Sequence, residues 1–118
     1  MLKRVGLVTL VCILGLLMVA CETLKISDII ADPGRFNGKE VTVAGKVTSL
    51  SVGALNMGLY EIDDGTGKLV VISEKGGAPA QGATVGVKGR IVPTFTFMGK
   101  SYVTVLRETD RKLVKSSD

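Results

Sequence analysis

Two seven-residue segments, 41–47 and 85–91, follow one pattern: valine, any residue, valine, any residue, glycine, a basic residue and an aliphatic residue. The alternation of apolar residues with small or polar ones is the period of a β-strand that buries one face. The glycines at the fifth position, Gly45 and Gly89, allow each strand to bend sharply. Because the pattern occurs only twice, the chain is not a repeat protein, and two long bent strands instead suit one small barrel.

The pattern of most of the remaining chain also predicts strands and turns. After Val47 the apolar residues Leu50 and Val52 fall on the opposite face, which predicts a bulge in the first strand. Before the strands, residues 24–30 can form one or two helical turns, which a Pro-Gly pair would end. The predicted strands are 40–52, 57–63, 68–73, 83–92 and 101–108.

Length and composition exclude several kinds of function. The chain has 118 residues, which is enough for one domain. It has no histidine, so a Ser-His-Asp triad is excluded and the commonest general base and metal ligand are missing. The carboxylates Glu61, Asp63 and Asp64 lie at a predicted hairpin turn, and a calcium site needs more oxygen ligands with a loop spacing. We therefore expect a protein that is not an enzyme and that has no cofactor and no metal.

A leader precedes the predicted domain. The chain starts with the basic residues Lys3 and Arg4, residues 5–19 carry no charge, and a small residue precedes Cys21. A positive start, an apolar stretch and a small residue at the cleavage point are typical of a secretory signal peptide. We therefore expect residues 1–20 to be removed. Of the 15 basic residues, the two in the leader would be lost, which leaves 13 against 11 acidic residues.

The segment 18–21, Met-Val-Ala-Cys, resembles the lipobox of bacterial lipoproteins, with Met18 where leucine is usual. The resemblance implies a diacylglycerol on the sulfur of Cys21 and cleavage just before it. Each buried methylene contributes about 0.8 kcal/mol, so two or three acyl chains would hold the protein on a membrane. We expect a lipid-anchored protein of the cell envelope, on the periplasmic or outer-surface side. The alternative is an uncleaved membrane helix, which needs roughly 20 apolar residues, more than this run supplies.

Residues 60–71 form a predicted strand, an Asp-Gly-Thr-Gly turn and a second strand. With the two glycine-containing strands and the final hairpin, this stretch resembles the OB-fold, as in anticodon-binding and single-strand-binding domains. The resemblance covers about residues 26–108 and implies an all-β, five-stranded Greek-key barrel with a short N-terminal helical segment. OB domains often place a helix between strands three and four, whereas the glycines and proline of 74–82 predict a bare loop. The expected organisation is a signal peptide at 1–20, a lipidated linker at 21–25, the barrel at 26–110 and a polar tail at 111–118.

Two expected loops, 51–56 and 93–100, lie where OB-folds usually meet their ligands. These loops and their flanks carry apolar side chains that can form a contact patch for a protein or peptide. Alternatively, Phe95 and Phe97 fold back to close the barrel end, because a small domain needs its aromatic residues in the core. The candidate contacts are Leu55, Met57, Tyr60, Phe95, Phe97 and Met98.

Nucleic-acid binding is the function that the OB resemblance suggests first. Tyr60 could stack on a base, and Lys46, Lys68, Lys88 and Arg90 could contact phosphates. These basic residues are scattered, the charge without the leader is nearly balanced and the loops are apolar, so we do not expect a nucleic-acid partner. We expect a membrane-anchored module that binds a protein or peptide. The alternatives are a nucleic-acid or oligosaccharide-binding domain and a structural subunit of an envelope complex.

Overall fold

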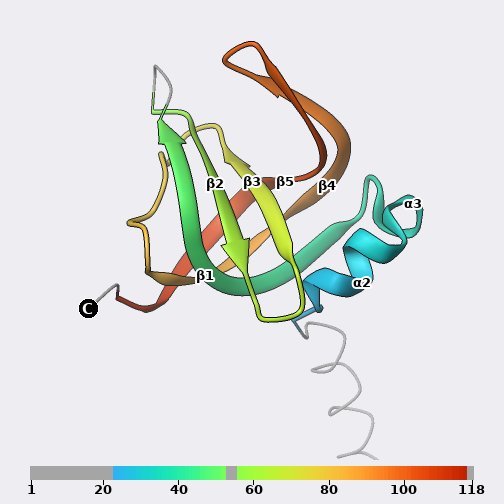
Figure 1. Ribbon diagram of the computed structural model, residues 1–118, viewed down its shortest axis with the longest axis horizontal. Helices are drawn as coiled ribbons and strands as arrows, with labels where there is room; N and C mark the ends of the chain where they lie inside the picture. The colour runs from blue at the N-terminus through green and yellow to red at the C-terminus, as the bar shows by residue number, and fades with distance from the viewer. Residues whose placement is uncertain (1–22, 53–55, 117–118) are drawn as a thin grey trace, which may run out of the picture.

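A computed structural model describes residues 23–52 and 56–116 of the chain. Two short helices, α2 (Ile26–Ala31) and α3 (Pro33–Phe36), come before five strands. The strands close into a barrel in the order β1-β2-β3-β5-β4, which confirms the predicted all-β, five-stranded fold (Figure 1). They are β1 (Glu40–Val52), β2 (Gly58–Asp63), β3 (Lys68–Ser73), β4 (Thr84–Phe97) and β5 (Lys100–Lys115).

β1 is bent so that its two halves pair with different neighbours. Its first half pairs with β4 and its second half pairs with β2. The register shifts between Val47 and Ser49, which confirms the bulge expected from the change of apolar phase. The bend needs glycine, because a side-chain carbon on Gly45 would lie 2.9 Å from the carbonyl oxygen of Asp63. One strand thereby serves both sides of the barrel.

The main core fills the interior of the barrel. The alternating valines of β1 and β4 are buried there with Ile62 of β2 and with Leu69 and Val71 of β3. The helix α2 adds Ile26 and Ile29, which are both fully buried. Burial of one isoleucine contributes about 1.5–3 kcal/mol, so packing rather than intrinsic propensity holds this short helix in place.

The turn between β2 and β3 also holds α2. Asp64 Oδ2 accepts a 2.9 Å hydrogen bond from the amide of Ile26, and Thr66 Oγ1 accepts a 3.1 Å bond from the amide of Ser27. Amides at the start of a helix have no partner within it, so these bonds satisfy both donors. Desolvation opposes the shift, but hydrogen bonds from Ile26 and Thr66 lower the pKa of Asp64 below its ordinary value. The predicted turn thus fixes the helix to the barrel.

β4 and β5 are both longer than predicted. β4 continues through Pro93 to Phe97, because β1 pairs only with its first half and leaves the second half at an edge that tolerates proline. β5 runs on to Lys115, and residues 111–115, which we expected to belong to a polar tail, pair with the start of β4. Backbone pairing needs no apolar side chains, so the polarity of this segment is a poor guide to its structure.

The described part of the chain begins at Thr23, three residues before α2. Within it, no helix combines the length and the apolar character that a membrane crossing requires. The expected signal peptide and the expected acylation of Cys21 lie outside the described residues and stay predictions.

Candidate functional site

A β-hairpin extends from the barrel wall where β4 meets β5 (Figure 1). Its turn consists of Met98 and Gly99, whose φ angles are 51° and 80°. Positive φ at both central residues is typical of a two-residue turn that matches the twist of its strands. The segment expected to be a loop, 93–100, is therefore mostly ordered strand. On one face of the hairpin, the cross-strand pairs closest to the turn are Phe97 with Lys100 and Phe95 with Tyr102.

The hairpin folds over the outer face of β2, β3 and β5. Side chains alternate along a strand, and Tyr60 and Ile62 of β2 belong to the interior core, so Leu59 points outward. Ile72 of β3 lies opposite Leu59 on this outer face. Phe97 belongs to the same cluster and is only 6% exposed. The hairpin thereby covers part of the face on which OB-folds usually take ligands.

Half-buried residues surround this covered centre. The ammonium of Lys100 lies 5.2 Å from the centroid of the Tyr102 ring, which is a cation–π distance. A partly exposed ring can stack on a planar group, and the lysine beside it can attract an anionic group. We call Phe95, Met98, Lys100 and Tyr102 the hairpin site. The outer cluster as a whole consists of Leu59, Ile72, Phe97 and Val105, with Met57, Val70, Val92, Phe95 and Tyr102 around them.

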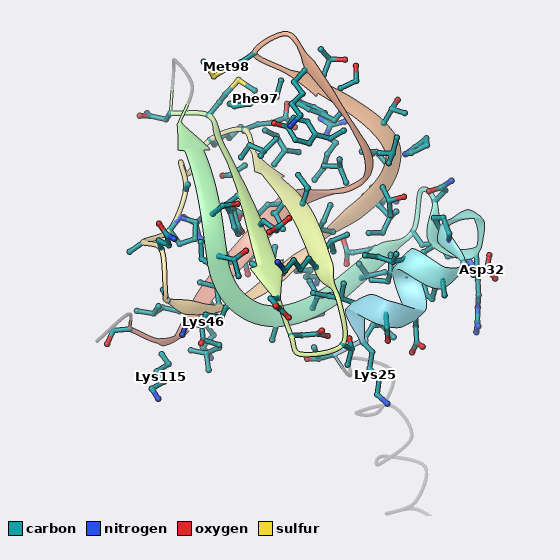
Figure 2. All side chains as sticks on the ribbon, in the orientation of Figure 1. Lys25, Asp32, Lys46, Phe97, Met98 and Lys115 are labelled. Carbon is teal, nitrogen blue, oxygen red and sulfur yellow. The ribbon has the colours of Figure 1, made fainter. Side chains whose placement is uncertain are left out.

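Three of the six predicted contact residues meet at this cluster. Met57, Phe95 and Phe97 lie in it together, although they come from two different connections of the chain. Phe97 is buried, as in the alternative in which it folds back onto the domain, but it packs outside the barrel wall. Met98 is 75% exposed at the tip of the hairpin (Figure 2). Leu55 lies outside the described residues.

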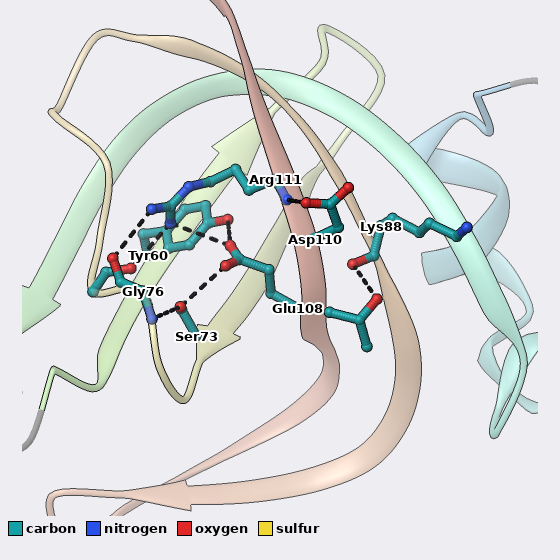
Figure 3. Close-up of polar contacts among 9 residues, drawn as sticks. Tyr60, Ser73, Gly76, Lys88, Glu108, Asp110 and Arg111 are labelled. Carbon is teal, nitrogen blue, oxygen red and sulfur yellow. Dashed lines mark hydrogen bonds and ion pairs between the residues drawn. The ribbon is translucent and has the colours of Figure 1, made fainter.

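Tyr60, expected at the surface, is instead fully buried in a polar network (Figure 3). Its hydroxyl donates a 2.5 Å hydrogen bond to Glu108, which also accepts bonds from Ser73 at 3.0 Å and from Arg111 at 3.2 Å. Burial, followed by the hydrogen bond to Glu108, raises the pKa of Tyr60 far above its ordinary value. Tyr60 is therefore a neutral donor that ties β2 to β5, and it cannot stack on a partner while the barrel is intact.

A cleft of about 690 Å³ opens beside this network, between β5 and the loop after β3. The two arginine side chains that line it are already hydrogen-bonded within the protein. Arg107 donates two hydrogen bonds to Glu74, at 3.0 and 2.6 Å, and Arg111 donates to the carbonyls of Gly76 and Gly77 at 3.2 and 3.0 Å. Residues 74–82 contain no helix, as predicted, and these bonds hold the start of that loop against the barrel.

The carboxylates near the β2–β3 turn have structural partners. Asp63 Oδ1 accepts a 2.8 Å bond from the amide of Gly65, and Glu61 Oε1 accepts a 2.9 Å bond from the hydroxyl of Thr48. Among residues 23–52 and 56–116, no group of three or more histidine, cysteine or acidic side chains is placed to hold a metal ion.

The basic residues considered as phosphate contacts belong to different environments. Lys88 forms a 3.3 Å ion pair with Glu40, and Arg90 donates a 2.8 Å bond to a backbone carbonyl. Lys46 and Lys68 lie on either side of a carboxylate in one row across β1, β2 and β3. None of these four residues belongs to the outer cluster under the hairpin.

Sequence reasoning missed Lys100 and Tyr102. The signal is present, because a Met-Gly pair stands between two segments that alternate like the strands of a hairpin. The predicted strand ends at residue 92 because Pro93 follows it. Proline ends a central strand, but it is tolerated in a strand at the edge of a sheet. Only the pairing of the strands shows that this part of β4 is an edge.

Comparison with known proteins finds structural neighbours. No protein-family model matches the chain, and no curated protein sequence matches it. Asparaginyl-tRNA synthetase from Pyrococcus horikoshii, in complex with asparaginyl-adenylate, is 18% identical, with a TM-score of 0.61 over 80% of this chain and 23% of that one. Aspartyl tRNA synthetase from Entamoeba histolytica is 13% identical, with a TM-score of 0.61 over 81% of this chain and 22% of that one.

These likenesses show that the chain has the OB-fold. The chain spans less than a quarter of the length of either synthetase. They also correct one expectation from the sequence. We did not expect a nucleic-acid partner, and this expectation is wrong, because the similar structures belong to enzymes that are named for tRNA.

Proposed function

We propose that this protein is an OB-fold module that binds single-stranded nucleic acid through the hairpin site. One observation carries the proposal: Phe95 and Tyr102 form a half-buried aromatic pair beside Lys100, on the face where OB-folds take ligands. The likeness in fold to two tRNA synthetases supports it. Bases stack on aromatic rings with little sequence preference, and a nearby lysine attracts the phosphates.

The hairpin site presents its groups in a form that favours binding. The ring of Tyr102 packs in the outer cluster beside Phe95, so little of its freedom is left to be lost when a base stacks on it. The lysine over that ring has a flexible stem, so its ammonium can move from the ring to a phosphate. Met98 at the exposed tip adds apolar surface for the edge of a base or sugar.

The proposal is tested by the fluorescence anisotropy of a labelled single-stranded oligonucleotide mixed with the full chain. We expect Tyr102→Ala to weaken binding about tenfold, because stacking of one base on an aromatic ring contributes about 1–3 kcal/mol. We expect Lys100→Gln to reduce the slope of log affinity against log salt by about 0.7, the loss of one phosphate contact.

The matched control is Val103→Ala. Val103 is 73% exposed and follows Tyr102 on the same strand, but it points to the other face of the hairpin. We expect this variant to bind like the wild type. Equal affinities of the wild type and Tyr102→Ala, or no binding by the wild type, would contradict the proposal. Thermal melts of each variant establish that the fold is intact.

A protein or peptide partner, the main expectation from the sequence, is the second candidate. The exposed apolar side chains of Met98 and Val103 favour it, because such groups at the end of a hairpin suit an apolar contact. A photoreactive amino acid in place of Met98 discriminates between the two candidates in cells. Cross-links to nucleic acid support the leading proposal, and cross-links to one polypeptide support the second.

We also propose that the protein is anchored to a membrane through an acylated Cys21, a proposal supported by the sequence of residues 1–21 alone. The mass of the N-terminal peptide isolated from cells tests it, beside a Cys21→Ala variant. A wild-type peptide that begins at acylated Cys21, with the leader retained in the variant, is the expected result. A wild-type peptide that begins at Met1 would contradict the proposal.

A further inference from the structure

We infer that the outer face of β1, β4 and β5 is a second contact surface for the phosphate backbone, an inference that rests on the proposed function. The strand register places Lys46, Thr84 and Lys115 in one cross-strand row. Residues paired directly across strands point to the same face, so both lysines stand on the outside of the barrel. Lys112 lies opposite Gly86, two residues from Thr84 on β4, and points to the same face. We call Lys46, Lys112 and Lys115 the basic face.

The surface between these lysines is low and open. Gly86 has no side chain, and Ala44, which pairs with it on β1, has only a methyl group. A carbon added to Gly86 would have nothing closer than a methyl group of Val114 at 3.9 Å. Neighbouring strands lie about 4.8 Å apart, so β1 and β5 are about 10 Å apart across β4. A sugar–phosphate chain can therefore lie along β4 with lysines on both sides.

No ion pair neutralises the basic face within residues 23–52 and 56–116. The ion pairs in this part of the chain are formed by Lys88, Arg107 and Arg111 instead. The nearest acid in the row is Asp63, opposite Lys46 on β2, and its Oδ1 accepts a 2.8 Å bond from the amide of Gly65. Asp110 Oδ1 likewise accepts a 2.9 Å bond from the amide of Arg111. None of the three lysines forms an ion pair in the described part of the chain, so their charges can attract a polyanion.

The occupant is the backbone of a strand already held at the hairpin site. Lysine contacts phosphate as a point charge and does not distinguish bases. The two rows that form this face carry lysine, threonine, alanine and glycine, with no ring on which a base could stack. Lys46 and Lys115 lie together at the end of the barrel remote from Phe97 and Met98 (Figure 2). A short strand can therefore fill only one of the two surfaces, whereas a long strand can reach both.

The test measures the binding of two labelled single strands to the full chain, about 6 and about 30 nucleotides long, because one OB-fold occupies about 4–16 nucleotides. In the test variant, Lys46, Lys112 and Lys115 are all replaced by glutamine. We expect unchanged affinity for the short strand and about tenfold lower affinity for the long strand. The salt slope for the long strand should fall by about 2, since each contact to a single-strand phosphate contributes about 0.7.

The matched control replaces Lys25, Lys39 and Lys75, three other exposed lysines, by glutamine and so changes the net charge equally. We expect it to bind the long strand like the wild type. An equal loss of affinity in the control would overturn the inference, because net charge would then explain the effect. Unchanged binding of the long strand by the basic-face variant would also overturn it.

Binding to vesicles that contain anionic lipid is measured as well, to distinguish a membrane from nucleic acid as the ligand of the basic face. If the basic-face variant lost binding to vesicles and kept its affinity for the long strand, the inference would be wrong. If the wild type bound neither strand, the proposed function would itself be contradicted. If the wild type bound both strands, and the basic-face variant bound each strand with the same affinity as the wild type, only the second surface would be contradicted. The two failures are therefore distinguishable.

Discussion

Gly89 shows how closely the backbones of β4 and β5 approach each other. A side-chain carbon at this position would overlap the carbonyl oxygen of Arg107. We expect Gly89→Ala to lower the free energy of unfolding by about 3 kcal/mol, because the two strands would have to separate. Gly34→Ala is the control, since nothing lies within 4 Å of the added carbon, and it should change stability by less than about 1 kcal/mol. Urea unfolding measures both, and similar small effects would contradict the close approach.

Tyr60 leads to a prediction about alkaline pH. Burial and its bond to Glu108 raise its pKa, so the folded protein keeps the proton when the unfolded chain releases it near pH 10. Stability that is fully present below pH 10 is therefore lost as the pH rises above it. We expect Tyr60→Phe to cost about 1–2 kcal/mol at neutral pH, since Glu108 loses a donor, and to weaken this alkaline loss. Urea unfolding at about pH 7 and about pH 11 is the measurement; an alkaline loss of the same size in the variant would refute the prediction.

At the scale of elements, the hairpin depends on one side chain for its position. Phe97 packs in the outer cluster with Leu59 and Ile72, whereas its neighbour Met98 is 75% exposed. We expect Phe97→Ala to destabilise the protein by about 2–4 kcal/mol, because it leaves a cavity between the hairpin and the sheet. The control Met98→Ala should cost less than about 0.5 kcal/mol. If both variants unfolded at the wild-type urea concentration, the hairpin would not be packed on the sheet as described.

The C-terminal part of β5 is the second element whose role can be measured. The guanidinium of Arg111 donates hydrogen bonds to the carboxylate of Glu108 and to the backbone carbonyls of Gly76 and Gly77. We expect a chain that ends after Asp110 to lose about 3 kcal/mol of stability, because a nearly buried carboxylate then lacks its cation. A chain that ends after Lys115 is the control and should be as stable as the full chain. Equal stability of the two shortened chains would show that residues 111–115 are a dispensable tail.

At the scale of the whole molecule, the sequence predicts the features that depend on periodicity. β1 and β3 begin and end at the predicted residues, because alternating valines and a continuous aliphatic run indicate strands whatever their partners. The second halves of β4 and β5 could not be predicted in this way. Whether a strand tolerates Pro93 depends on its being an edge, and an edge is a property of the assembled barrel.

The same distinction applies to the candidate site. The positions of two connections in the OB-fold place Met57 and Phe97 near each other, and both lie in the outer cluster. The burial of Tyr60 was not predictable from local sequence, because its acidic partner Glu108 lies 48 residues away. An exposed tyrosine and a buried one with a distant partner have the same local pattern.

The most direct test of the proposed function is hydrogen–deuterium exchange of the full chain with and without a single-stranded oligonucleotide of about 12 nucleotides. We expect the amides of residues 94–103, and those of β2 and β3 beneath them, to exchange more slowly when the strand is bound. The amides of α2 and α3 should exchange at the same rate in both samples. No change in residues 94–103 at saturating oligonucleotide, or slower exchange confined to the helices, would contradict binding at the hairpin site.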